Sequence, residues 1–167
     1  MNAGAYGGDM SQVLRSVTVF AKGQVQKMPV DQLRLGYRSS EIMRQKWVVL
    51  SAELELQPGD PAAIAAVMND LNDRRRQKQP LRYPSCGSFF KRPEGYFAGA
   101  LIEQAGLKGC QIGGAQISDL HAGFVINAGG ATAADIYRLM CHVQATVKER
   151  FGVDLEPEVR LEGSFEV

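Results

Sequence analysis

The sequence predicts an α+β fold, built as one domain or as one small domain with part of another. Three observations in the 167 residues support this class. The first sixty residues contain strand-like stretches in which apolar residues alternate. Two later stretches repeat apolar residues at the i, i+3, i+4, i+7 spacing of a helix. Glycines gather in residues 1–8, 85–99 and 106–130, where the chain is expected to form loops.

The first elements are predicted to be strands. Residues 1–8 resemble an interior glycine-rich loop, and a hairpin then follows, with strands over 13–20 and 24–28 and a turn at Lys22-Gly23. A further strong strand is expected over 46–56. Its alternation predicts that one face carries the apolar residues Val48, Leu50, Ala52, Leu54 and Leu56.

A long helix is predicted next. Asp60 suits the N-cap and Pro61 the first helical position, and a stripe of Ile64, Val67, Met68 and Leu71 follows. The helix ends in a basic run at 74–78. These residues complement the negative end of the helix dipole, although a phosphate-binding patch is the alternative. A domain boundary is placed between residues 78 and 79.

The second half is predicted to alternate loops with helices. A loop over 83–88 leads to a short helix over 97–105, and a strand is expected at 123–127. The last helix is expected to begin at an N-cap, Thr132, and to end at Gly152. A final strand is predicted over 153–161. The buried stripe of the last helix is predicted to be Ile136, Leu139, Met140, Val143 and Val147.

Composition and motifs exclude several functional classes. The net charge of +1 argues against a nucleic-acid-binding protein, and no stretch is apolar enough for a membrane span. The three cysteines and two histidines lack metal-ligand spacing, so no metal site is expected, and a reducing cytoplasmic compartment is the simplest location. No phosphate-binding loop or Rossmann motif occurs. Cys86 is interpreted as a small buried apolar residue rather than a reactive thiol.

Six segments in order resemble the UDP-N-acetylenolpyruvoylglucosamine reductase (MurB) family of bacterial flavoenzymes. They are MNAGAYGG (1–8), GYRSS (36–40), QPLRYPSCGSFFKRP (79–93), AGALIEQAGLKG (98–109), IGGAQISDLHAGFVIN (112–127) and FGVDLEPEVRLEG (151–163). The resemblance implies that residues 1–78 form the rear part of an FAD-binding, PCMH-like α+β domain. Residues 79–167 would form the substrate-binding C-terminal domain.

The family's reaction implies three catalytic residues. NADPH reduces FAD, and a hydride then passes to UDP-N-acetylglucosamine enolpyruvate, giving UDP-N-acetylmuramate for peptidoglycan synthesis. Ser88 matches the donor of the proton to C2 of the enolpyruvyl group. Arg38 matches the cation that stabilises the developing enolate. Glu158 matches the family's catalytic glutamate, which would act protonated or hydrogen-bonded beside that enolate.

The resemblance also implies binding residues. Tyr37 and His121 correspond to substrate contacts, and Arg92 stands where the family motif has asparagine. An N-terminal FAD-binding domain precedes the NAGAYG segment in the family, so that domain is expected to be supplied in cis or in trans. A non-catalytic UDP-sugar-binding or interaction fragment is the alternative function. The residues expected to contact the cofactor are Asn2, Gly4, Ala5 and Tyr6.

Overall fold

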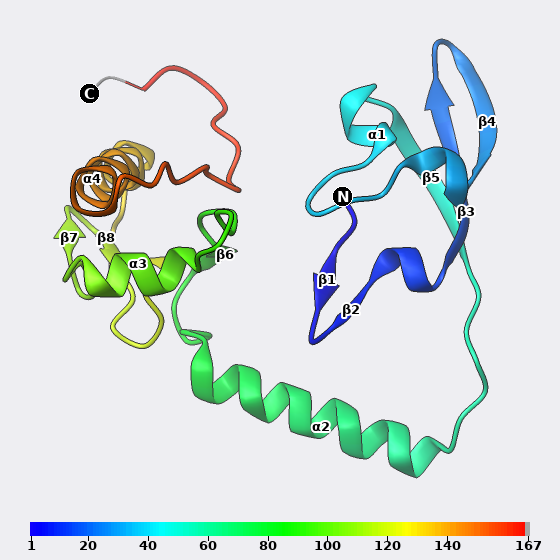
Figure 1. Ribbon diagram of the computed structural model, residues 1–167, viewed down its shortest axis with the longest axis horizontal. Coiled ribbons are helices and arrows are strands. Elements are labelled where there is room, and N and C mark those ends of the chain that lie inside the picture. Colours follow the sequence, from blue (N-terminus) through cyan, green and yellow to red (C-terminus); the bar gives the residue numbers. More distant parts are fainter. Residues whose placement is uncertain (166–167) are drawn as a thin grey trace. The chain divides into compact units, whose positions relative to one another are not determined.

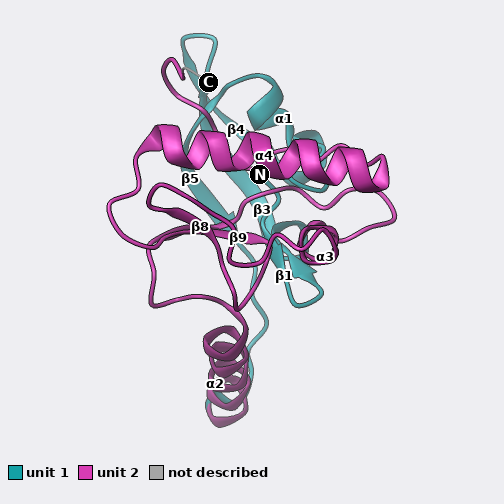
Figure 2. Cartoon of the chain, turned by 90° about the vertical axis from the view of Figure 1, so that its left-hand side faces the viewer, with its two compact units in different colours: residues 1–61 teal, residues 62–167 magenta. Residues whose placement is uncertain are grey.

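The computed structural model describes residues 1–165 and divides the chain into two compact units (Figures 1 and 2). The first unit is Met1–Pro61 and the second is Ala62–Val167. The long helix that begins at Pro61 is therefore grouped, apart from that first residue, with the second unit. The boundary between functional domains at 78/79 stays a prediction, because compactness and domain function need not divide at the same residue.

The first unit is built on a three-stranded antiparallel sheet with strand order β4-β3-β5. A two-stranded sheet, two 3₁₀ turns and a short helix accompany it. The elements are β1 (Gly4–Ala5), β2 (Gly8–Asp9), η1 (Met10–Gln12), β3 (Leu14–Ala21), β4 (Gln24–Pro29), η2 (Val30–Leu33), α1 (Glu41–Arg44) and β5 (Val48–Leu54). A small core gathers on one side of the central strand: Leu14, Val17, Val19, Ala21 and Leu33.

The predicted hairpin and the predicted strand over 46–56 are confirmed as β3, β4 and β5. The prediction that the alternating apolar residues of β5 share one face is wrong. A register shift between Thr18 and Val19 of β3 sets Val48 opposite Phe20 but Ala52 opposite Val17. Phe20 and Val17 lie three residues apart in one strand and so on opposite faces. A bulge in the pairing therefore overrides the alternation in the sequence.

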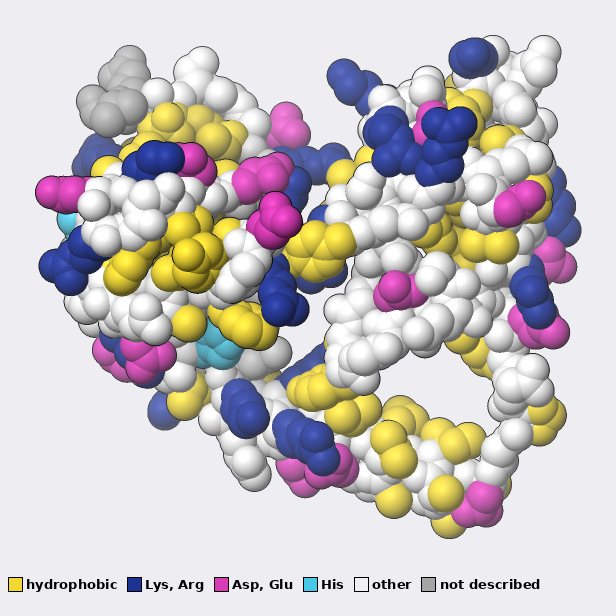
Figure 3. Space-filling model, in the orientation of Figure 1, with side chains coloured by type: hydrophobic (Ala, Val, Ile, Leu, Met, Phe, Trp, Pro, Cys, Tyr) yellow, Lys and Arg dark blue, Asp and Glu magenta, His cyan; other side chains and the backbone are white. Residues whose placement is uncertain are grey.

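The predicted long helix is confirmed as α2 (Pro61–Lys78), and its apolar stripe is not buried. None of its residues is buried, and Ile64, Val67 and Met68 are 48%, 58% and 59% exposed. Apolar side chains are visible along this helix in Figure 3. Two of the terminal arginines form ion pairs within the helix, Arg74 with Asp70 and Arg76 with Asp73. These pairs support the structural interpretation of the basic run.

The second unit packs two helices on a four-stranded antiparallel sheet with order β6-β9-β8-β7. Both helices contribute to its core, which includes Phe89, Leu101, Ile102, Ile117 and Leu139. The elements after α2 are β6 (Ser85–Ser88), α3 (Ala98–Gln104), β7 (Gln111–Ile112), β8 (Ala115–Ile117), β9 (Phe124–Asn127) and α4 (Ala133–Phe151).

The last helix, α4, is confirmed in its cap, its end and its buried stripe. The Thr132 hydroxyl accepts a hydrogen bond from the backbone N–H of Asp135, and the Asp135 carboxylate accepts one from the N–H of Thr132. Gly152 ends the helix in the left-handed conformation that glycine favours. The stripe faces the core of the unit: Leu139, Met140, Val143 and Val147 are buried and Ile136 is partly buried.

The predicted final strand over 153–161 is wrong. This segment is irregular and makes one isolated bridge, between Phe90 and Pro157. Apolar residues do alternate along it, but Pro157 has no N–H to donate to a strand ladder. The segment instead follows residues 89–91 for a short distance, and that local pairing positions part of the candidate site.

Candidate active site

Ser88 lies at the end of β6, where the strand meets β9. It is paired with Phe124, and a bulge separates this pair from the pair of Ser85 with Ile126. The next residue, Phe89, is 1% exposed and donates its N–H to the carbonyl of Gly123 at 2.9 Å. Because side chains alternate along a strand, the buried Phe89 ring directs the Ser88 side chain away from the core. Ser88 is exposed, so its hydroxyl is available to a ligand. Cys86 of the same strand is exposed as well, so the prediction that it is buried is wrong.

Glu158 is held beside the same strand by its backbone. Its N–H donates to the carbonyl of Phe89 at 2.9 Å, and the N–H of Lys91 donates to the carbonyl of Glu156 at 2.8 Å. Leu155, which is 3% exposed, anchors the start of this segment in the core. Two residues that lie seventy positions apart in the sequence, Ser88 and Glu158, are therefore set on adjoining backbone segments of one unit.

Two side-chain contacts fix the C-terminal segment in this place. Lys91 and Glu156 form an ion pair across the two adjoining segments. On the side of α4, the side-chain amide of Gln144 donates to the carbonyl of Leu155 at 2.8 Å. The sequence predictions missed both contacts. Their signal in the sequence was weak, because each contact joins residues that lie far apart in the chain or in different elements.

Arg92 follows the Ser88 strand and lies against an aromatic ring. Its guanidinium carbon is 4.0 Å from the centre of the Phe97 ring, a cation–π contact. Phe97 is 62% exposed and immediately precedes α3. The contact orients a cation on the outer surface of the unit.

His121 is half-buried and its ring is oriented by two neighbours. Its Nδ1 accepts the N–H of Gly123 at 3.0 Å, and its ring packs edge-on against Phe124 at 4.9 Å between centroids. Desolvation lowers the pKa of His121 from its ordinary value of 6.5. The ring is therefore neutral at pH 7 and carries its proton on Nε2. It can donate one hydrogen bond to a phosphate oxygen but supplies no positive charge.

The predicted cofactor residues form the tight β1–β2 hairpin of the first unit. Gly4 pairs with Asp9 and Ala5 with Gly8, and the turn residues Tyr6 and Gly7 have φ of 52° and 83°. Two positive φ values at the turn are typical of a two-residue hairpin. The hairpin residues from Gly4 to Tyr6 are exposed. A flat ligand could therefore approach the backbone of the hairpin closely.

Asn2 joins this hairpin to the segment that carries Arg38. It is 7% exposed, its side-chain oxygen accepts the N–H of Ser11 at 3.0 Å, and its backbone forms a parallel bridge with Tyr37. The cofactor candidates and the substrate candidate Tyr37 are thus neighbours within one unit. The side-chain oxygen of Asn2 is already engaged by the N–H of Ser11, so a cofactor would contact mainly the backbone of Asn2.

Tyr37 and Arg38 form the tip of a tight turn. Gly36 and Ser39 exchange two backbone hydrogen bonds of 3.1 Å across it. Arg38 has φ of 48°, a left-handed conformation that is uncommon for a residue other than glycine. Its guanidinium carbon lies 5.3 Å from the centre of the Tyr37 ring. Tyr6, Lys22, Arg34 and Lys46 also have positive φ, so the backbone conformation does not single out Arg38, and its catalytic role stays a prediction.

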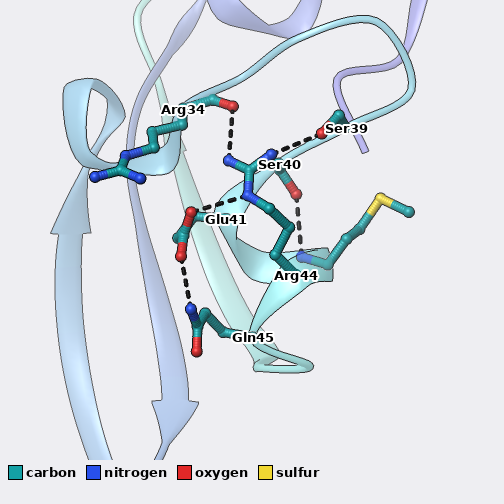
Figure 4. A network of polar contacts seen from close by, with 7 residues as sticks. Arg34, Ser39, Ser40, Glu41, Arg44 and Gln45 are labelled. Atoms are coloured by element: carbon teal, nitrogen blue, oxygen red, sulfur yellow. Dashed lines mark hydrogen bonds and ion pairs between the residues drawn. The ribbon is translucent and has the colours of Figure 1, made fainter.

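A polar network holds the base of this turn (Figure 4). Arg44 donates to the hydroxyl of Ser39 at 2.8 Å, to the carbonyl of Arg34 at 3.2 Å and to the carboxylate of Glu41 at 3.0 Å. Ser40 is fully buried and caps α1 through the N–H of Met43. Hydrogen bonds from Gln45 and then Arg44 lower the pKa of Glu41. The network explains how a four-residue helix can brace the Arg38 turn.

The structure thus brings the predicted residues together in two groups. Ser88 and Glu158 are neighbours in the second unit, while Asn2, the hairpin and the Tyr37–Arg38 turn are neighbours in the first. The meeting of the two groups around one substrate stays a prediction. Within residues 1–165, no group of three His, Cys, Asp or Glu side chains is placed to hold a metal ion. No helix in that range is long and apolar enough to cross a membrane.

Comparisons with known proteins agree with the resemblance. The model of the UDP-N-acetylenolpyruvoylglucosamine reductase C-terminal domain matches residues 79–162. The reductase of Exiguobacterium sibiricum is 52% identical over 164 residues, which cover 98% of this chain and 54% of that protein. The reductase of Limosilactobacillus reuteri is 54% identical, with 98% and 55% covered.

A solved structure gives the same result. The UDP-N-acetylenolpyruvylglucosamine reductase (MurB) of Thermus caldophilus superposes with a TM-score of 0.82 at 35% identity, over 95% of this chain and 57% of that one. The chain spans about half the length of the curated relatives it matches. Because the model of the C-terminal domain matches residues 79–162, this chain belongs to the UDP-N-acetylenolpyruvoylglucosamine reductase (MurB) family.

Proposed function

We propose that this chain supplies the substrate domain and the rear part of the flavin domain of an NADPH- and FAD-dependent reductase of UDP-N-acetylglucosamine enolpyruvate. The observation that supports the proposal is the backbone hydrogen bond from Glu158 to Phe89, because it sets the backbone of this glutamate next to the residue that follows Ser88, the serine that would donate the proton. The product would be UDP-N-acetylmuramate, a cytoplasmic precursor of peptidoglycan.

The first unit would hold one edge of a flavin. The exposed hairpin of small residues at Gly4 and Ala5 leaves room for a planar ring, and Tyr6 at its turn is 52% exposed. Asn2, Gly4, Ala5 and Tyr6 would hold that edge. When bound, FAD supplies the hydride that is added to the enolpyruvyl double bond. An upstream FAD-binding segment, in cis or in trans, would make the remaining cofactor contacts.

The chain's own residues account for the polar steps at the substrate. Arg38 would pair with the substrate carboxylate, because a guanidinium fork matches two carboxylate oxygens and stabilises the charge that develops there. The Ser88 hydroxyl would donate a proton to C2. Glu158 would hydrogen-bond beside the enolate. Arg92 and His121 would contact the substrate diphosphate, Arg92 as a cation and His121 as a neutral donor.

Exclusion of water is required for this chemistry. A serine hydroxyl is a weak acid in water and transfers its proton efficiently only to a strongly basic carbon in a dry, fixed geometry. Ser88 is exposed in this chain. Bound substrate and the flavin-binding part of the enzyme would therefore have to cover it. Activity is expected to require both parts of the protein.

A non-catalytic fragment that binds the UDP-sugar is the second candidate, since the chain spans only about half of its relatives. Two measurements on the purified chain separate the candidates. Uptake of added FAD, seen as a flavin absorption band, supports the reductase, whereas a colourless protein excludes catalysis by this chain alone. Calorimetry with the UDP-sugar tests the substrate domain, and absence of both heat and thermal shift contradicts a retained sugar site.

Glu158 is tested in a joined protein. In this joined protein, the part of the E. sibiricum reductase that does not match this chain is fused in front of Met1. Glu158→Gln keeps a hydrogen-bond donor, so it is expected to slow reoxidation of reduced flavin by substrate less than Glu158→Ala does. Equal losses in the two variants would contradict a donating role for Glu158.

A further inference from the structure

The short pairing between residues 89–91 and 156–158 has the bonding pattern of two antiparallel strands. Phe90 and Pro157 form its bridge, and one backbone hydrogen bond lies on each side of that bridge, at 2.9 and 2.8 Å. Phe90 and Pro157 are thus a pair that exchanges no bond with each other. Because the N–H of a residue in such a pair points away from the partner segment, proline costs this pairing no hydrogen bond.

Lys91 and Glu156 lie opposite each other at one end of this pairing. Their backbones share the hydrogen bond of 2.8 Å, and their side chains form an ion pair. The side chain of Lys91 is 32% exposed and that of Glu156 is 70% exposed. Opposite charges directly across two paired segments favour their register, and like charges at the same positions oppose it. The sign of these two charges therefore bears on the register of the pairing.

The residues that precede Glu156 are held by α4. The side-chain amide of Gln144 donates to the carbonyl of Leu155 at 2.8 Å, and Leu155 is 3% exposed. Lys148 and Asp154 form an ion pair of 2.6 Å, in which the Asp154 side chain is 83% exposed. The buried Leu155 separates this outer ion pair from the pairing. Glu156 is thus the position at which support of the chain passes from α4 to the paired segment.

We propose that Lys91 is a positioning residue of the reductase and acts through its ion pair with Glu156. That pair fixes the register in which the backbone of Glu158 lies against the residue that follows Ser88. The inference rests on the proposed function and deepens it, because it adds a residue that acts through its neighbours. A slip of the pairing would move the carboxyl group relative to the hydroxyl, and a misplacement of about 1 Å can cost on the order of 100-fold in rate.

Charge reversal in the joined protein tests the proposal, because the ion pair can be broken and made again. Lys91→Glu sets two carboxylates opposite each other. We expect it to slow reoxidation of reduced flavin by UDP-N-acetylglucosamine enolpyruvate at least about 10-fold and to leave flavin reduction by NADPH unchanged. Calorimetry should show that the affinity of the oxidised protein for this substrate changes less than about 3-fold. Adding Glu156→Lys should restore reoxidation to within about 3-fold of the unmodified rate.

Lys148→Glu is the matched control. It reverses the other ion pair of the same segment, with Asp154, and the buried Leu155 lies between that pair and the pairing. Because exposed ion pairs contribute little, reoxidation should change less than about 3-fold. A loss as large as that of Lys91→Glu would mean that any disturbance of the segment slows the reaction, and it would contradict a specific role for Lys91.

Hydrogen exchange of the Glu158 amide, followed by NMR in this chain alone, tests the register without catalysis. This amide donates to the carbonyl of Phe89 at 2.9 Å. Its exchange should become at least about 10-fold faster in Lys91→Glu and should return in the double variant with Glu156→Lys. Unchanged exchange in Lys91→Glu would overturn the proposal. If Lys91→Glu does not fold, Lys91→Met removes the charge alone and must also speed this exchange and slow reoxidation.

The kinetic outcomes separate this inference from the proposed function. An active joined protein in which Lys91→Glu leaves reoxidation unchanged would refute only the positioning role. Failure of the double variant to recover would also refute it, since the charges would then not act as a pair. An unmodified joined protein that binds the substrate but does not reoxidise its flavin would refute the proposed function itself.

Discussion

At the scale of single residues, Gly114 is the clearest case in which backbone packing dictates the amino acid. A Cβ added at this position would overlap the backbone nitrogen of Ala131 and the carbonyl oxygen of Gly129. Neither atom can move without distorting the turn after β9, whose residue Ala128 donates to the carbonyl of Gly114 at 2.9 Å. Glycine is therefore required where the β7–β8 turn meets the start of α4.

We predict that Gly114→Ala destabilises the second unit by about 1–3 kcal/mol, the usual cost of overpacking. Gly36→Ala is the control, because its added Cβ would meet only the Ser39 side chain at 3.9 Å. Thermal unfolding followed by circular dichroism measures both variants. A Gly114→Ala midpoint as high as that of Gly36→Ala would show that the turn relaxes freely.

His121 gives a prediction for pH. Desolvation lowers the pKa of His121 in the folded protein, so the unfolded chain binds a proton more readily near pH 6.5. The stability contributed by the neutral ring is present above that pH and is lost as the pH falls through 6.5 towards the lower folded value. Denaturant unfolding between pH 5 and 8 should show this decline. His121→Gln should flatten it, and an unchanged slope would contradict the assignment.

At the scale of elements, residue patterns predicted the structure best where the residues of one element set its start, its end and its buried face. The last helix was predicted with its cap, stripe and end because Thr132, Asp135 and Gly152 act locally. Patterns failed where pairing with another segment decided the outcome. The bulge opposite Thr18 divided the apolar face of β5, and Pro157 turned an alternating segment into an irregular one.

A matched pair of helix substitutions tests this contrast. Leu139 of α4 is fully buried, whereas Ile64 of α2 is 48% exposed. Leu139→Ala should cost about 2–5 kcal/mol, because it leaves a cavity in the core of the second unit. Ile64→Ala should change the stability of this chain by no more than about 0.5 kcal/mol. Equal losses in denaturant unfolding would mean that α2 packs against the core in solution.

At the scale of the whole molecule, the candidate site is divided between two compact units. Arg38 and the hairpin from Gly4 belong to the first, and Ser88 and Glu158 to the second. Composition and spacing alone predicted none of these roles, since a serine, an arginine and a glutamate are ordinary surface residues. The resemblance of six segments selected them. The structure added the hydrogen bond that sets Glu158 beside Phe89 and the network that braces the Arg38 turn.

The most direct test of the proposed reductase is Ser88→Ala in the joined protein, measured by stopped-flow absorbance of the flavin. Reduction of the flavin by NADPH should proceed at the rate of the unmodified protein, because Ser88 acts only on the substrate. Reoxidation of the reduced flavin by UDP-N-acetylglucosamine enolpyruvate should slow by at least about 100-fold, the scale of a lost general acid. Reoxidation at the unmodified rate would contradict the role of Ser88.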